Sequence, residues 1–181
     1  MGPSLRNTSN GLLSVFLMPQ SVDVDDSVDV ESSVTPPPSS VEAVLAVMRA
    51  FDASTDEAAF WRLPVAGYTS GNLTIDIEWN SWGSQTTGTV VWEAQLAAYT
   101  PETDTGAIES KALGTLNYVQ DTHLGTTATR LMRCTITLSN LDSLADGDAV
   151  WLRIARDATG TNATDSMTGD AGFAGAWVTY S

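Results

Sequence analysis

The fold of this chain is decided by residues 72–99, which begin with the run Leu73-Thr74-Ile75-Asp76-Ile77-Glu78-Trp79. The odd positions of this run are apolar and the even positions are polar. Because side chains alternate between the two faces of a β-strand, the run predicts a strand with one buried and one solvated face. A second run places five apolar residues on one face: Val90, Trp92, Ala94, Leu96 and Ala98. Two such strands need a second apolar layer to cover them.

The composition favours a folded, β-rich domain. The 181 residues suffice for one domain with a sizeable core, and 43% of them are hydrophobic. The formal net charge is −14, which argues against nucleic-acid binding and against attachment to anionic lipid, because both need a basic face. We interpret the charge as a self-repelling, soluble surface, with docking onto a basic partner as the alternative.

Cysteine usage and hydropathy limit the possible surroundings of the protein. The single cysteine, Cys134, excludes an internal disulfide and a paired-cysteine metal site, and fits a reducing compartment. The apolar run at residues 11–18 is too short to cross a bilayer, and no small-residue cleavage site follows it. We therefore expect no membrane segment and no signal peptide.

Residues 1–40 differ from the rest of the chain. Residues 22–31 alternate valine with acidic residues, and Pro36-Pro37-Pro38 is a stiff, extended spacer. We interpret residues 1–40 as an extended N-terminal arm that orders where it meets a partner, and residues 41–181 as the domain. The alternating run is either a solvated tether or an added strand. Calcium binding there is disfavoured, because the glycine and closing glutamate of an EF-hand loop are missing.

The pattern from residue 58 onward is that of strands. Strand-forming runs occur at 58–65, 72–80, 87–99, 113–120, 130–138, 150–154 and 173–180. Residues 41–51 have helical spacing and a capping box, so the strand count is seven, or eight if part of this segment is extended. Short strands separated by turn signals predict an all-β fold, a jelly-roll-like β-sandwich.

No catalytic constellation is recognisable in the sequence. His123, the single histidine, lies in a polar loop where we expect it to be solvated, and no Gly-x-Ser-x-Gly elbow or phosphate loop is present. Cys134 shares a face with Met132 and Ile136, which predicts a core residue rather than a nucleophile. We therefore predict a non-enzymatic protein with no cofactor and no metal.

The six tryptophans and one polar cluster are the remaining candidates for contacts. Trp79 and Trp92 lie on apolar strand faces and are expected in the core, whereas Trp82 lies in a loop, where it could stack on a sugar or a partner. We expect the others on outer faces, suited to a subunit interface: Trp61, Trp151 and Trp177. A structural polar cluster that pins the loop before the last strand is expected from Arg156, Asp157, Asp165 and Asp170.

An ordered set of short motifs resembles a family of phage proteins. The motifs are Phe51-Asp52-Ala53-Ser54-Thr55-Asp56-Glu57, Leu63-Pro64 with Tyr68, residues 73–79, Thr87-Gly88-Thr89-Val90-Val91-Trp92, Gly147-Asp148, Arg153-Ile154-Ala155-Arg156-Asp157 and Gly169-Asp170-Ala171. Over residues 46–181 the chain resembles small β-sandwich virion proteins of tailed bacteriophages, of the capsid-decoration (cement) or head-fibre type. The resemblance implies a homotrimer on the capsid lattice, and an extended backbone at residues 47–52.

The expected function is a virion structural role. The resemblance implies a decoration protein, made in the host cytoplasm, that binds the outer capsid surface and has the major capsid protein or other virion proteins as partners. The arm would cross to a neighbouring subunit or to the shell, and the expected contact residues are Leu12, Leu13, Val15, Phe16, Leu17 and Trp82. The alternative is a receptor- or carbohydrate-binding module of a tail fibre or spike, suggested by Trp82, Tyr68 and the acidic loops.

Overall fold

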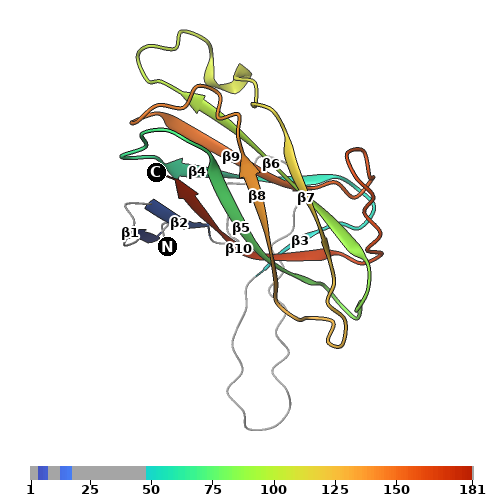
Figure 1. Cartoon of the computed structure of the whole chain (residues 1–181). Coiled ribbons are helices and arrows are strands. Elements are labelled where there is room, and N and C mark those ends of the chain that lie inside the picture. Colours follow the sequence, from blue (N-terminus) through green and yellow to red (C-terminus); the bar gives the residue numbers. More distant parts are fainter. Residues whose placement is uncertain (1–3, 8–12, 18–47, 181) are drawn as a thin grey trace.

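A computed structural model describes residues 4–7, 13–17 and 48–180 of the chain (Figure 1). Within these residues there are ten strands, one short 3₁₀ turn and no α-helix, and so no helix long and apolar enough to cross a membrane. The strands are β1 (Ser4–Asn7), β2 (Leu13–Leu17), β3 (Arg49–Phe51), β4 (Glu57–Pro64), β5 (Leu73–Ser81), β6 (Thr89–Tyr99), β7 (Asn117–Thr122), β8 (Met132–Leu138), β9 (Ala149–Arg156) and β10 (Ala171–Tyr180); the 3₁₀ turn is η1 (Ile108–Ser110).

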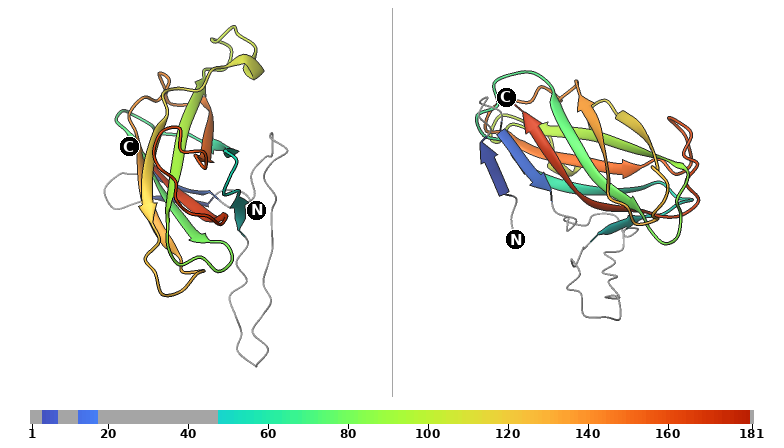
Figure 2. Two further views of the ribbon diagram at one scale, coloured as in Figure 1. Left: turned by 90° about the vertical axis from the view of Figure 1, so that its right-hand side faces the viewer. Right: turned by 60° about the horizontal axis from the view of Figure 1, so that its bottom comes forward.

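The strands form two antiparallel sheets stacked as a sandwich (Figures 1 and 2). One sheet contains β3, β10, β5 and β8, extended by β2 and β1, and the other has the order β4-β9-β6-β7. When the strands are counted from β3, the first sheet has the order 1-8-3-6 and the second 2-7-4-5, which is the connectivity of a jelly roll. The predicted jelly-roll-like β-sandwich is confirmed. The extended segment at β3 brings the number of jelly-roll strands to eight.

The first strand of this jelly roll is split in two. Both β2 and β3 run antiparallel to β10, with Leu17 opposite Ala176 and Arg49 opposite Phe173. The two segments therefore run in the same direction along one edge of β10, and residues 18–48 separate them in the chain. A single continuous strand would need only about three residues to bridge the same distance along β10.

This arrangement corrects the predicted N-terminal arm. Residues 4–7 and 13–17 belong to the larger sheet, and Val15 and Leu17 are completely buried. Four of the five residues in 13–17 are apolar, so the segment can bury one face against the core when it pairs as a strand. The helical pattern predicted for residues 41–51 is wrong at Arg49–Phe51, which is extended, and residues 41–47 and the predicted boundary at residue 40 lie outside the described residues.

The core lies between the sheets and is centred on aromatic rings. Trp79 and Trp92 are completely buried with ring centroids 6.4 Å apart, and Phe51 lies edge-on to Trp92 at 5.2 Å. Trp61 packs against Phe173 at 5.1 Å and is only 5% exposed, so its predicted position on an outer face is wrong. Both faces of β4 are apolar around Trp61, and for this reason alternation alone could not assign the side.

The β7 strand begins later than predicted. It spans Asn117–Thr122 rather than 113–120, and Tyr118 is 49% exposed whereas Val119 packs against the core. Tyr118 therefore lies on the outer face of the sheet.

Candidate functional site

The candidate site lies on the outer face of the four-stranded sheet. Arg62 of β4, Trp151 of β9 and Ala97 of β6 stand side by side across three strands. Their chain neighbours face the core, so these residues are turned outward by strand alternation. Phe60, two residues before Arg62, lies on the same face. An outward-facing row with this much apolar surface is unusual for the solvated side of a sheet.

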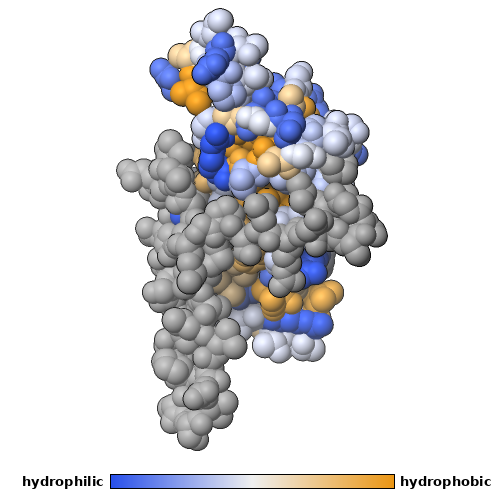
Figure 3. Space-filling view, turned by 90° about the vertical axis from the view of Figure 1, so that its left-hand side faces the viewer, coloured by the Kyte–Doolittle hydropathy of each residue, from blue (hydrophilic) through white to orange (hydrophobic). Residues whose placement is uncertain are grey.

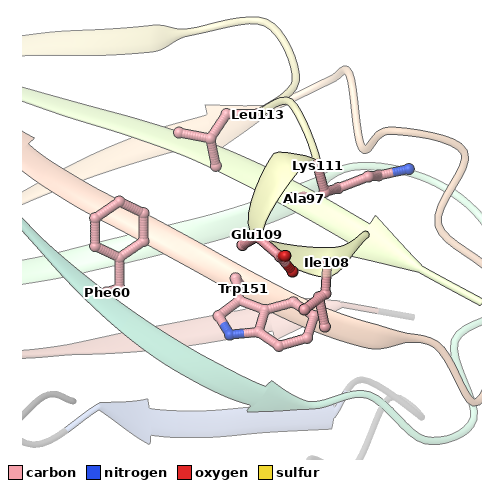
Figure 4. Close-up of a pocket in the computed structure, with 7 residues that line it drawn as sticks. All are labelled: Phe60, Ala97, Ile108, Glu109, Lys111, Leu113 and Trp151. Carbon is pink, nitrogen blue, oxygen red and sulfur yellow. The ribbon is translucent and has the colours of Figure 1, made fainter. Parts of the chain in front are cut away.

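A loop folds over this row and encloses a groove of about 480 Å³. We call it the outer-face groove, and it is lined by Phe60, Ala97, Ile108, Glu109, Lys111, Leu113 and Trp151 (Figure 4). Ile108 of η1 is 47% exposed. In a space-filling view, apolar side chains gather beneath the loop at the upper end of the molecule and are bordered by hydrophilic ones (Figure 3). The groove therefore has an apolar floor and a polar rim.

Hydrogen bonds hold the loop over the groove. The Tyr99 hydroxyl donates to the carbonyls of Asp104 and Gly106, at 2.7 and 2.9 Å, and the Gly114 N–H donates to Leu96 O at 2.8 Å. Lys111 forms an ion pair with Asp142 at 3.2 Å, and this contact raises the pKa of Lys111. The loop is thus tied to β6 at both ends, which makes the groove a preformed feature.

A cation is stacked on Trp151, one of the two aromatic rings that line the groove. The Arg62 guanidinium carbon lies 4.3 Å from the centroid of the Trp151 ring, and Nη1 donates to Val150 O at 3.3 Å. Partial burial of the guanidinium lowers the pKa of Arg62. The other two cations on this face have carboxylate partners, Lys111 with Asp142 and Arg153 with Glu93 at 3.3 Å. In the described part of the chain, Arg62 has no carboxylate within ion-pair distance.

The predicted arm contacts lie within the chain's own sheet. Val15 and Leu17 are buried, and the Phe16 ring lies 4.8 Å from Trp177. While β2 keeps this pairing, Val15 and Leu17 have no surface left for a neighbour, so their assignment as contact residues is wrong. The backbone of Leu13 pairs with Tyr180, and Leu12 lies outside the described residues.

The loop residue Trp82 is half-buried rather than projecting. Its backbone N–H donates to Asp170 O at 2.8 Å. Its ring lies so close to Gly172 that a β-carbon on Gly172 would be 3.2 Å from Trp82 Cε3. Tyr68 is similarly occupied, because its hydroxyl donates to Gly71 O at 2.8 Å and its ring faces Tyr180. Neither ring is placed as an open stacking platform.

Two residues of the predicted polar cluster, Arg156 and Asp165, form a buried ion pair. Arg156 is completely buried and forms a two-pronged ion pair with Asp165, both N···O distances being 2.9 Å. It also donates to the carbonyls of Phe51, Gly169 and Met167. This arrangement pins the loop between β9 and β10, as expected of a structural salt bridge.

Asp157 and Asp170 act separately from that ion pair. Asp157 accepts hydrogen bonds from the backbone N–H groups of Thr161 and Asn162, at 2.8 and 2.6 Å, and thereby shapes the turn that follows β9. Asp170 accepts from the N–H of Ala53 at 3.1 Å and connects that loop to the start of β10. All four residues of the predicted cluster make structural contacts, and none of them lines the groove.

His123 is buried, which contradicts the prediction of a solvated side chain. It is 6% exposed, Nδ1 accepts from the Gly125 N–H at 3.0 Å, and Nε2 lies 2.9 Å from Ala128 O. Because Nδ1 is an acceptor, Nε2 carries the proton. In the described residues His123 forms no hydrogen bond to a serine or an acid, and no group of potential metal ligands occurs among them.

Sequence reasoning missed the groove, although a signal for it exists. Phe60 and Trp61 are consecutive, as are Trp151 and Leu152, so these strands are apolar on both faces. A half-solvated strand would alternate, and apolar residues on the second face indicate that this face is covered or in contact.

The comparisons with known proteins are sparse. No protein-family model matches the chain, and no curated protein matches it in sequence. Among solved structures, one similarity is to a chain described as the structure of infectious bursal disease virus Gx strain. It covers 93% of this chain and 42% of that chain, with 16% identity and a TM-score of 0.27. This chain thus spans less than half the length of that one, and a TM-score of 0.27 is too low to establish a shared topology.

Proposed function

We propose that this chain is a structural protein of a virion, and more narrowly a decoration protein that binds the outer surface of a bacteriophage capsid and reinforces it. The observation that supports the proposal most directly is the outer-face groove, an apolar and preformed contact surface on a jelly roll. The motifs between residues 46 and 181 that resemble phage decoration proteins support it independently. The role is adhesive and non-enzymatic, and the expected partner is the major capsid protein.

Reinforcement would follow from binding to the assembled shell alone. A protein that binds the shell but not the separated subunits shifts the equilibrium toward the shell by mass action. If the protein is a homotrimer, three weak contacts linked in one molecule gain affinity through effective concentration. The net charge of −14 favours encounter with basic patches on the shell and keeps free copies apart.

Binding to capsids that lack the protein tests the proposal. Purified protein would be added in excess to such capsids, and the bound copies counted after the free protein is removed. We expect saturation at a fixed number of copies per lattice point and a higher temperature of capsid disruption. Binding that does not saturate, or saturation with no change in that temperature, contradicts the proposal. The solution mass of the free protein would identify a trimer.

A receptor-binding module of a tail fibre or spike is the second candidate. The observation that favours it is the presence of two aromatic side chains, Phe60 and Trp151, in one groove, because aromatic rings can stack on sugars. A glycan array separates the two functions. Glycan binding that disappears with Trp151→Ala, together with absence of binding to capsids, would favour this module over a decoration protein.

A further inference from the structure

We propose that the outer-face groove binds an extended peptide segment in which an apolar side chain is followed closely by an aspartate or glutamate. If the proposed function is correct, this segment belongs to the shell protein, and the identity of the partner rests on that function. The class of ligand rests on the groove itself.

The preference for an apolar side chain comes from the floor of the groove. Phe60 and Trp151 supply aromatic surface from β4 and β9, and Ile108 and Leu113 supply aliphatic surface from the overlying loop (Figure 4). Ile108 is 47% exposed although it lies beside this apolar surface. A buried apolar side chain of a partner would remove this surface from water, which is the dominant favourable term in association.

The preference for a carboxylate comes from Arg62. Its guanidinium carbon lies 4.3 Å from the centroid of the Trp151 ring, and Val150 O accepts from one of its five N–H groups. Lys111 and Arg153 are already paired with Asp142 and Glu93. Arg62 thus has no carboxylate within ion-pair distance among the described residues, and it stacks on a ring that lines the groove. Arg62 itself lines a neighbouring hollow together with Asp148. A carboxylate of the ligand complements Arg62, and a planar guanidinium can bind that group through two N–H donors.

Shape and polarity favour a peptide over a glycan. A sugar-binding site combines stacking with several convergent polar groups that meet the hydroxyls. Here the polar rim has two charged side chains, Glu109 and Lys111, and Lys111 is occupied by Asp142. One wall of the groove is β4, which is the terminal strand of its sheet. A segment entering from this edge can therefore be longer than the groove.

A peptide selection on the full-length protein tests the ligand class directly. A display library of random twelve-residue peptides would be panned on immobilised protein, and enriched peptides measured by calorimetry. We expect them to share an apolar residue followed within three positions by Asp or Glu. The affinity should fall about tenfold or more with Arg62→Glu, because the charge pairing becomes repulsive. Arg133→Glu is the matched control, since Arg133 is also exposed but pairs with Glu78 on the other sheet.

The apolar contact is tested by a second pair of variants. Ile108→Asp should weaken the same peptides about tenfold or more, because a carboxylate would enter the apolar groove. Leu124→Asp, at a side chain that is 63% exposed and lies outside the groove, should leave the affinity unchanged. Enrichment of no common motif, or peptides that bind the Arg62 and Ile108 variants as well as the wild type, would overturn the inference. So would a groove that binds arrayed glycans instead.

Capsid binding by the same variants separates this inference from the proposed function. If wild-type protein coats capsids and the Arg62 and Ile108 variants coat them equally well, the groove inference is wrong and the decoration function stands. If the wild type selects apolar–acidic peptides through Arg62 but does not bind capsids, the decoration function is wrong and the ligand class of the groove stands. Circular dichroism of each variant confirms that it is folded.

Discussion

Phe16 of β2 lies directly over Gly175 of β10. A β-carbon at Gly175 would lie 2.5 Å from Phe16 Cζ and 2.8 Å from the Leu17 carbonyl oxygen. Gly175 also has φ of +149°, a conformation that residues with a side chain rarely adopt, and it marks an irregularity in the pairing of β10 with β5. Close packing of β2 against β10 therefore requires glycine at position 175.

Replacing this glycine should loosen the β1–β2 hairpin. We expect Gly175→Ala to lower the free energy of unfolding by about 1–3 kcal/mol, because it combines backbone strain with a steric clash. Faster hydrogen exchange at Val15 and Leu17 would show that β2 has separated from β10. Gly106→Ala is the control, since no atom lies within 4 Å of a β-carbon there, and we expect a change within about 0.5 kcal/mol. Equal effects at both positions would contradict the prediction.

The buried ion pair between Arg156 and Asp165 should be important for stability. Asp165→Asn leaves the completely buried guanidinium without a counter-charge, and we expect a loss of about 3–5 kcal/mol in the free energy of unfolding. Glu78→Gln provides the comparison, because its partner Arg133 is largely exposed and such a pair contributes about 0–1 kcal/mol. Urea denaturation of both variants measures the difference, and losses of similar size would refute the assignment.

Asp157 should make the fold sensitive to acid. Burial of this carboxyl opposes its ionisation, but N–H donors from Asn162, Thr161, Ala163 and Gly160 together outweigh burial and lower its pKa. A lowered pKa in the folded state means that the contribution of Asp157 is fully present above about pH 4, the ordinary carboxyl value, and is lost as the pH falls through the lowered pKa. Urea midpoints measured between pH 7 and pH 2 should show this fall. It should be smaller in Asp157→Asn, and an unchanged profile in that variant would exclude the role.

Cys134 should be chemically silent in the folded protein. It is 8% exposed, and burial raises the pKa of its thiol far above the ordinary value. Because the thiolate is the reactive form, the native protein should react with a thiol reagent only as fast as it unfolds. The full signal of one thiol should appear in denaturant. Rapid labelling of the native protein would show that β8 opens readily.

The sequence predicted the sandwich well because β5 and β8 are each buried on one face and more exposed on the other. The alternation of apolar and polar residues in 73–79 predicts β5 correctly. In β8, every second residue is buried, as the sequence of 130–138 predicts. The order in which strands pair is a different matter. It depends on contacts between residues far apart in the chain, so the short strands and turn signals indicated a jelly-roll-like sandwich but not which strands pair.

Errors concentrate where both faces of a strand are covered or where a loop folds back. Trp61 and Phe60 are consecutive and both apolar, so the sequence does not show which of the two faces the core. The hydrogen bond between His123 and Ala128 O depends on the conformation of the loop that contains both residues. The outer-face groove depends on Ile108 and Leu113 reaching over β6 and β9. Local sequence propensity does not predict that the loop folds back over the sheet, because hydrogen bonds to residues of β6 position the loop.

The split first strand makes the molecule a natural carrier for foreign sequences. The chain runs from Leu17 of β2 to Arg49 of β3, and these two residues pair with positions of β10 only three apart. An epitope or a whole domain with neighbouring termini inserted between Leu17 and Met48 would preserve the register on either side, because β2 and β3 each pair with β10. The entropic cost of closure grows only slowly with the length of an insert. On a coated particle, such a graft would be presented as a regular array.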